Sequence, residues 1–181
     1  MINSEAEQPA DKQLVGAIRQ NDKEAFKILY YKYFKPLFRY SWYRIRSVET
    51  SCDLVQDIFL NVWSKRRNLD PDKSIKAYLY KSLNNKIINL LKLKSSQTLS
   101  LEVKRFREKI CEEKNLDTEI DITTALEQLP EKIKIVYTLS RLEGFKYSEI
   151  AEICSISVKA VEKRMTKAFG LLRKSLAEKD F

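Results

Sequence analysis

The sequence predicts an all-α protein in which a polar linker joins two small helical domains. Apolar residues recur at helical spacing along most of the chain, and the period-two alternation of half-buried strands is absent. Three glycines and four prolines are few interruptions for 181 residues, a length that fits one domain or two small ones. We expect a disordered tail over 1–10, a first domain over 11–94, a linker over 95–121 and a second domain over 122–181.

Four helices are expected in the first domain, and the first two begin at acidic or amide caps. Asp11 can cap a short helix, and Asn21 or Asp22 can cap the next one. An aromatic stripe runs along this second helix, and Pro36 should kink or interrupt it. The stripe consists of Phe26, Leu29, Tyr30, Tyr33 and Phe34.

The other two helices of this domain are separated by a turn. Thr50 or Ser51 starts the third helix, whose broad apolar face ends at Trp63. Residues 68–72 form a cluster of turn-forming residues, and Ser74 opens the fourth helix. Residues 95–121 then lose the helical pattern and carry mixed charge, which makes this segment the best domain boundary.

Four shorter helices are expected in the second domain. The first lies around 122–129, and the second runs over 131–142 and ends at Gly144, a plausible left-handed cap. The third begins at Ser148 and the fourth at Ser157.

The last two helices have the pattern of a helix-turn-helix. Residues 154–156 form a short turn between them, and the small Ala151 lets the helices cross closely. Such turns often carry glycine where this chain has Ser155, so we expect a shifted turn rather than none. An ordinary helical hairpin with a solvated basic surface is the alternative. The residues expected to point inward from the last helix are Val158, Val161, Met165 and Ala168.

The composition excludes several classes of protein. The chain contains no histidine, which rules out histidine-dependent catalysis and histidine-containing zinc sites. Cys52, Cys111 and Cys154 are far apart, so neither a disulfide framework nor a thiolate metal site is expected. No nucleophile–base pair or P-loop is present either, and we expect no enzyme, no cofactor and no small-molecule substrate. The lack of a membrane-spanning stretch and of a secretory signal favours a reduced cytoplasmic protein.

Positive charge concentrates in two parts of the chain. Of the formal net charge of +9, residues 64–94 carry nine basic and two acidic side chains, a net charge of +7. Residues 122–181 carry a smaller excess, with eleven basic and eight acidic side chains. Two such segments are typical of a protein that holds a polyanion at two places, and a solvated lysine-rich surface is the alternative.

The exposed face of the last helix is the first candidate surface, a contact with duplex DNA. Long basic side chains can reach guanine edges or phosphates, and Ala160 can touch a thymine methyl group. The first backbone N–H groups after Ser157 can bind a phosphate. The candidates are Ser157, Lys159, Ala160, Lys163, Arg164 and Lys167, and Glu162 and Thr166 lie on the same face.

A second candidate surface lies on the third helix of the first domain. Its acidic and amide side chains, in an otherwise basic protein, suit a basic protein partner better than DNA. A solvated helix exterior with Trp63 in the core is the alternative. The members are Asp53, Gln56, Asp57, Leu60 and Asn61.

Two groups of strings then resemble a known family. DLVQDIFLNVW (53–63) resembles the region 2 signature of the extracytoplasmic-function (ECF) sigma factors of bacterial RNA polymerase, which belong to the sigma-70 family. Three later strings resemble region 4 of the same family, and the match covers roughly 11–175 in the family's order. Lys159 and Ala160 depart from the family's usual Gly-Thr. The region 4 strings are ALEQLP (125–130), LEGFKYSEIA (142–151) and ISVKAV (156–161).

The resemblance implies a sigma factor that binds core RNA polymerase and directs promoter recognition and transcription initiation. Region 2 would dock on the β′ clamp helices through the second candidate surface. Region 4 would contact the β flap and bind the −35 element through its helix-turn-helix. An anti-sigma factor at the inner membrane would hold the protein inactive.

The resemblance also assigns the fourth helix of region 2 to the −10 element, which it would open and hold. Lysines would track phosphates, asparagines would meet base edges, and Tyr78 and Tyr80 could stack on exposed bases. A core position for Tyr78 is the alternative, since most aromatic residues here have packing positions. The candidates are Lys76, Tyr78, Lys81, Asn84, Asn85, Lys86, Asn89 and Lys92.

Two other classes of function stay open from the residues. One is a stand-alone helix-turn-helix regulator whose first domain dimerises or senses a signal. The other is a helical adaptor that binds only protein. Transcription in vitro with core polymerase separates all three.

Overall fold

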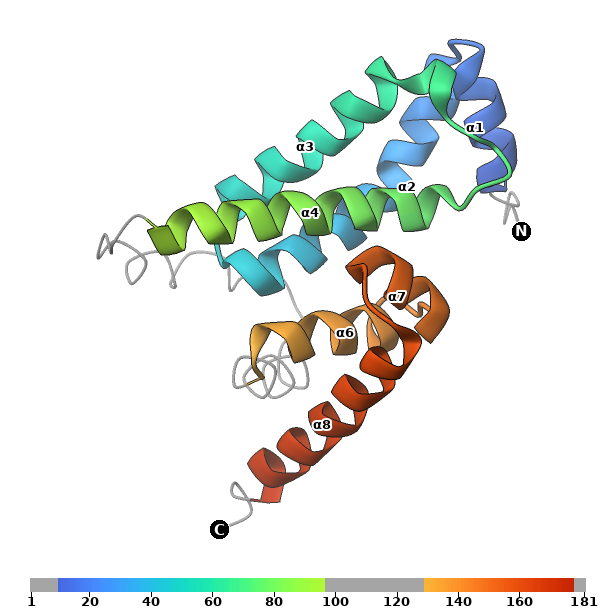
Figure 1. The fold of residues 1–181 in the computed structure, drawn as a ribbon. Coiled ribbons are helices and arrows are strands. Elements are labelled where there is room, and N and C mark those ends of the chain that lie inside the picture. Colours follow the sequence, from blue (N-terminus) through green and yellow to red (C-terminus); the bar gives the residue numbers. More distant parts are fainter. Residues whose placement is uncertain (1–9, 97–128, 178–181) are drawn as a thin grey trace, which may run out of the picture. The chain divides into compact units, whose positions relative to one another are not determined.

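The computed structural model describes residues 10–96 and 129–177, and all regular secondary structure in these ranges is helical (Figure 1). This confirms the predicted fold class. The chain divides into two compact units, Met1–Ile87 and Ile88–Phe181. The expected tail, most of the linker and the helix around 122–129 lie outside the described residues. Among the described helices, none has the length and apolar character needed to cross a bilayer.

The first unit is built around an antiparallel pair of long helices (Figure 1). Phe26 near the start of α2 (Lys23–Ile45) contacts Trp63 near the end of α3 (Val48–Ser64), with ring centroids 5.0 Å apart. Apolar side chains at helical spacing are completely buried between the helices, among them Leu29, Leu37 and Leu83. The helices are α1 (Asp11–Arg19), α2 (Lys23–Ile45), α3 (Val48–Ser64), the 3-10 helix η1 (Arg66–Asn68) and α4 (Ile75–Ser96), which extends beyond this unit.

Two helices of this unit begin at side-chain caps that the sequence predicts. The Asp22 carboxylate accepts hydrogen bonds from the backbone N–H groups of Glu24 (2.8 Å) and Ala25 (3.0 Å). The Ser74 hydroxyl accepts one from Ala77 (3.1 Å). These contacts satisfy donors that have no partner within the first turn of a helix.

Asp11 has a different role from the predicted one. Ala10 precedes α1 as its cap, and Asp11 is the first helical residue. Its carboxylate accepts a hydrogen bond from the Tyr33 hydroxyl and pairs with the Lys32 ammonium of α2 at 2.9 Å. Burial, and then this carboxylate, raise the pKa of the Tyr33 hydroxyl well above its usual value. Asp11 therefore fastens α1 to α2.

The long helices also differ from the prediction at two points. Of the two predicted effects of Pro36, a kink or an interruption, the interruption is absent, because α2 is helical on both sides of the proline. The packing of α2 along its length outweighs the one hydrogen bond that proline removes. Helix α3 begins at Val48, because the Ser47 hydroxyl accepts a hydrogen bond from the Thr50 N–H at 3.2 Å. The predicted start at Thr50 or Ser51 was therefore two or three residues too late.

A buried polar cluster joins α2 to α4. The Asn84 side-chain oxygen accepts hydrogen bonds from the Arg44 guanidinium (2.7 Å) and the Tyr40 hydroxyl (3.2 Å). Asn84 is 1% exposed, and the completely buried Tyr80 packs edge-on against Tyr40. The expectations that Asn84 reads base edges and that Tyr80 stacks on bases were therefore wrong. Both side chains point into the unit, where Asn84 accepts hydrogen bonds from two polar groups of α2.

Over residues 129–177, the second unit has three helices around a small apolar core. After α6, the chain reverses at Gly144, whose φ of +71° confirms the predicted left-handed cap. The Phe145 N–H then donates to the Leu139 carbonyl at 3.0 Å, which closes the end of the helix. The helices are α6 (Glu131–Arg141), α7 (Tyr147–Cys154) and α8 (Val158–Ala177), and the core includes Val136, Leu139, Ile150, Val161, Met165 and Ala168.

Helices α7 and α8 form the predicted helix-turn-helix. Ser155 adopts the left-handed conformation with φ of +54°, so the turn forms without glycine. The Ser157 hydroxyl caps α8 by accepting a hydrogen bond from the Ala160 N–H at 3.2 Å. Ser148 does not cap α7. Its first turn is closed instead by the Glu149 carboxylate, which accepts from the N–H of the residue before the helix.

Replacing Asn84 by alanine should lower the free energy of unfolding of the first unit by about 1–3 kcal/mol, because buried donors lose their acceptor. Both tryptophans of the chain, Trp42 and Trp63, lie in this unit, so their fluorescence reports its unfolding in urea. Asn85→Ala is the matched control, since Asn85 is exposed and should change stability little. Equal losses in the two variants would contradict the buried role.

Replacing Ser157 by alanine should destabilise the first turn of α8 by about 1 kcal/mol, which raises amide hydrogen exchange there about fivefold. Ser148→Ala should leave exchange in α7 almost unchanged, because its exposed hydroxyl caps nothing. Hydrogen exchange followed by mass spectrometry measures both. A larger effect from Ser148→Ala would show that the caps are assigned the wrong way round.

Candidate nucleic-acid and polymerase interfaces

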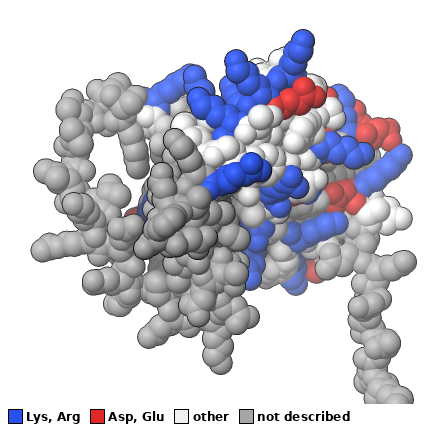
Figure 2. All heavy atoms as spheres, turned by 90° about the horizontal axis from the view of Figure 1, so that it is seen from below, with Lys and Arg blue, Asp and Glu red and all other residues white. Residues whose placement is uncertain are grey.

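Helix α8 turns a basic surface to solvent. Lys159, Lys163 and Lys167 are exposed and Arg164 is half-buried, whereas the core residues of the second unit cover the opposite side of the helix. None of these four cations forms an ion pair within the described residues. We call them the α8 face. Figure 2 shows one side of the molecule on which lysine and arginine side chains clearly outnumber acidic ones.

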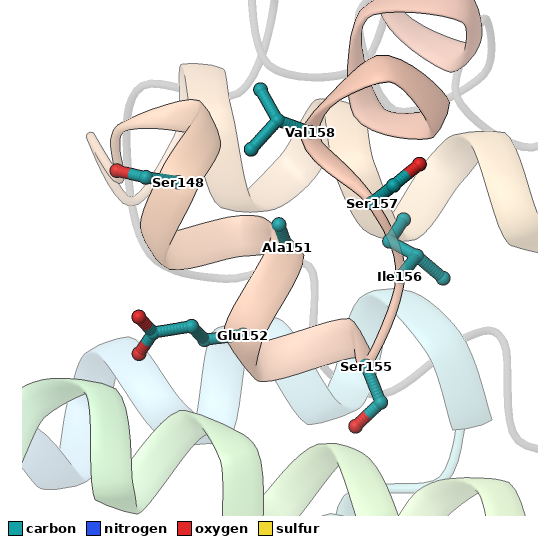
Figure 3. A pocket seen from close by; sticks show the side chains of 7 residues that line it. All are labelled: Ser148, Ala151, Glu152, Ser155, Ile156, Ser157 and Val158. Carbon is teal, nitrogen blue, oxygen red and sulfur yellow. The ribbon is translucent and has the colours of Figure 1, made fainter.

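The first turn of α8 borders an open hollow beside α7 (Figure 3). Val158 is 42% exposed and lines this hollow together with Ser148 and Glu152, so the expectation that it points inward was wrong. It is the first residue of the helix, at the margin of the apolar stripe. Ser157 is exposed as expected, whereas Ala160 is half-buried.

Helix α4 presents a stripe of polar residues along one side. Lys81, Asn85, Asn89 and Lys92 are exposed, and Tyr78 is 39% exposed. Steps of three or four residues separate them, which places them on one side of the helix. We call these five residues the α4 stripe. Lys76 and Lys86 are half-buried beside it.

Helix α3 carries the predicted protein-binding surface in one exposed patch. All five expected residues are exposed, and Leu60 is 67% exposed although it is apolar. The apolar side of α3 faces the interior of the unit, and Val55 and Val62 on that side are completely buried. Leu60 thus adds apolar area to an otherwise acidic and amide surface. We call Asp53, Gln56, Asp57, Leu60 and Asn61 the docking face.

One ion pair joins the docking face to α4. The Lys86 ammonium lies 2.9 Å from an Asp57 carboxylate oxygen, and both side chains remain partly exposed. An exposed pair of this kind contributes about 0–1 kcal/mol to stability. The sequence assigns the two residues to different surfaces and has no signal for their contact, because 29 positions separate them.

Two family models match the parts of the chain that carry these surfaces. The family model described as "Sigma-70 region 2" matches residues 29–97, which include the docking face and the α4 stripe. The description "Sigma-70, region 4" matches residues 119–172, which include the helix-turn-helix and the α8 face.

Relatives and solved structures of similar proteins agree with both matches. "RNA polymerase sigma factor SigV" of Bacillus subtilis (strain 168) is 28% identical over 144 residues, which is 79% of this chain and 86% of the relative. "ECF RNA polymerase sigma-E factor" of Escherichia coli (strain K12) is 25% identical over 177 residues, 90% and 92% of the two chains. A structure of CnrH in complex with the cytosolic domain of CnrY has a TM-score of 0.69 at 22% identity and covers 94% of this chain and 99% of that one. The sigma factor RpoE in complex with the anti-sigma factor NepR from Bartonella quintana has the same score and identity, with 84% and 96% covered. The chain therefore belongs to the sigma-70 family, in its ECF group, and is a transcription initiation factor.

Proposed function

We propose that this sigma factor directs core RNA polymerase to promoters through three separate surfaces. The docking face binds the polymerase, the α4 stripe holds the opened −10 element, and the α8 face reads the −35 element as a duplex. One observation carries the proposal: the acid and amide side chains of α3 and the cations of α4 and α8 form distinct exposed surfaces. A protein that must grip an enzyme and a polyanion together needs this separation of charge.

The docking face suits a helical partner with basic side chains, such as the β′ clamp helices. Leu60 provides apolar area at the centre, and the surrounding carboxylates and amides provide a polar rim. Opposite charge on the partner would steer the encounter and fix the orientation. By resemblance to the family, region 4 would also contact the β flap of the polymerase.

The α4 stripe suits single-stranded DNA. Lys81 and Lys92 can follow phosphates, Asn85 and Asn89 can meet base edges, and Tyr78 offers an exposed ring for stacking. Unpairing costs a few kcal/mol per extruded base, and contacts made only with the opened strand offset this cost. The chain thus promotes melting by differential binding, and the polymerase performs the synthesis.

We also propose that an anti-sigma factor at the inner membrane keeps this protein inactive. The support is that two solved structures with the same fold contain the cytosolic domain of CnrY and the anti-sigma factor NepR. An inhibitor that covers the docking face would exclude the polymerase, because both would need the same exposed Leu60.

The purified chain should support initiation at a defined promoter with core polymerase, and neither component should do so alone. Asp53→Lys should weaken core affinity about tenfold, or 1.4 kcal/mol, because it reverses a charge on the docking face. Glu24→Lys, an equal charge change on the exposed start of α2, is the control. Competition binding with labelled chain measures the affinities. Tight binding of a dimer to palindromic DNA without polymerase would identify a stand-alone regulator instead.

Lys81→Ala and Arg164→Ala should weaken promoter binding in different ways. Loss of a Lys81 phosphate contact should lower affinity for all sequences alike and reduce the salt slope by about 1. Loss of Arg164 should cost about 1–3 kcal/mol and relax the preference at one upstream base pair. Holoenzyme binding to promoter variants at several salt concentrations separates the effects, with Lys35→Ala, on an exposed part of α2, as control. Identical profiles for all three variants would refute the assignment.

A further inference from the structure

Glu162 is an acidic side chain in the middle of a basic surface. It is exposed in the second turn of α8, between Lys159 and Lys163 in sequence. Within the described part of the chain, its carboxylate forms no ion pair and no hydrogen bond. Only its backbone carbonyl has a side-chain partner, the Thr166 hydroxyl at 3.1 Å.

The stability of α8 provides no reason for a carboxylate at this position. Glu162 lies beyond the first turn, where the helix dipole favours negative charge most. The residue four positions later is Thr166 rather than a lysine, and Lys159, three positions earlier, forms no ion pair with Glu162 in the described part of the chain, so neither helical ion pair is present. The buried side of the helix, with Val161 and Met165, does not include Glu162.

The chemistry of the DNA major groove restricts what a carboxylate can bind there. A carboxylate only accepts hydrogen bonds, and it is repelled by phosphates, to which the neighbouring lysines are attracted. Guanine presents the acceptors N7 and O6, and thymine presents O4, so both are unfavourable partners. Adenine places its N6 donor beside the acceptor N7, whereas cytosine presents its N4 amino group as a donor. Cytosine is therefore the base that satisfies Glu162 best.

We propose that Glu162 determines the base specificity of this sigma factor upstream, by accepting a hydrogen bond from the N4 amino group of a cytosine in the −35 element. This inference rests on the proposed function of the α8 face and deepens it. The lysines bind phosphates and therefore add affinity for DNA of any sequence. Glu162 disfavours the DNA sequences that leave its carboxylate without a hydrogen-bond donor. Val158, one turn earlier on the same side of α8, adds exposed apolar area beside it, which suits a thymine methyl group.

The test compares holoenzymes on a promoter library in which every base of the upstream element is varied. The wild-type chain should prefer cytosine at one position by about 5- to 150-fold. Glu162→Gln should shift that preference toward adenine and keep the others, because the amide accepts from adenine N6 and donates to N7. Glu162→Lys should change the preferred base at the same position to guanine, whose O6 and N7 accept from lysine.

Glu152→Gln is the matched control, because it removes one exposed negative charge from α7. It should raise affinity for all sequences and leave every base preference unchanged. Unchanged binding of the variants to core polymerase shows that they are folded. If the wild-type chain initiates at no promoter, the proposed function fails and this inference falls with it. If the wild type initiates and both Glu162 variants keep its preferences at every position, the assignment of Glu162 alone is wrong.

Discussion

A buried hydrogen bond from the Arg44 guanidinium to the Asn84 side-chain oxygen, at 2.7 Å, ties α4 to α2. Both groups lie in the interior, where a polar atom without a partner is costly, so this contact and the completely buried Leu79, Leu83 and Ile87 favour the same rotation of α4 about its axis. With Asn84 inside, the helical repeat turns Lys81, Asn85 and Asn89 to solvent. The proposed single-strand surface is thus a consequence of a contact on the opposite side of the helix.

Separation of charge is the second organising feature. Asp57 of the docking face pairs with Lys86 of α4, so the docking face and the cations beside the α4 stripe adjoin each other. Partial exposure keeps this pair weak, and either partner can exchange it for another at little cost. On α8 the proposed function uses the same separation within one helix, where the exposed Glu162 interrupts a row of exposed cations.

The family resemblance and the geometry contribute different information. The resemblance assigns surfaces to partners. It assigned Asn84 to DNA because Asn84 lies in the fourth helix of region 2, which the family uses for the −10 element. Geometry decides which side chains can meet a partner at all, and it removes Asn84 and Tyr80 from that surface. The helical pattern predicted a core position for Val158, but the structure exposes its side chain at the first turn of α8 (Figure 3).

Local chemistry by itself determined the helical class, the caps at Asp22, Ser74 and Ser157, and the turn at Gly144, because these depend on a few neighbouring residues. The polar and exposed side of α3 followed from its periodicity for the same reason. Only the tertiary structure decided the partner of Asn84. Helical spacing groups Asn85 with the exposed Lys81 and Asn89, but no sequence pattern identifies the partner of Asn84, because the Arg44 guanidinium that it binds lies forty residues away.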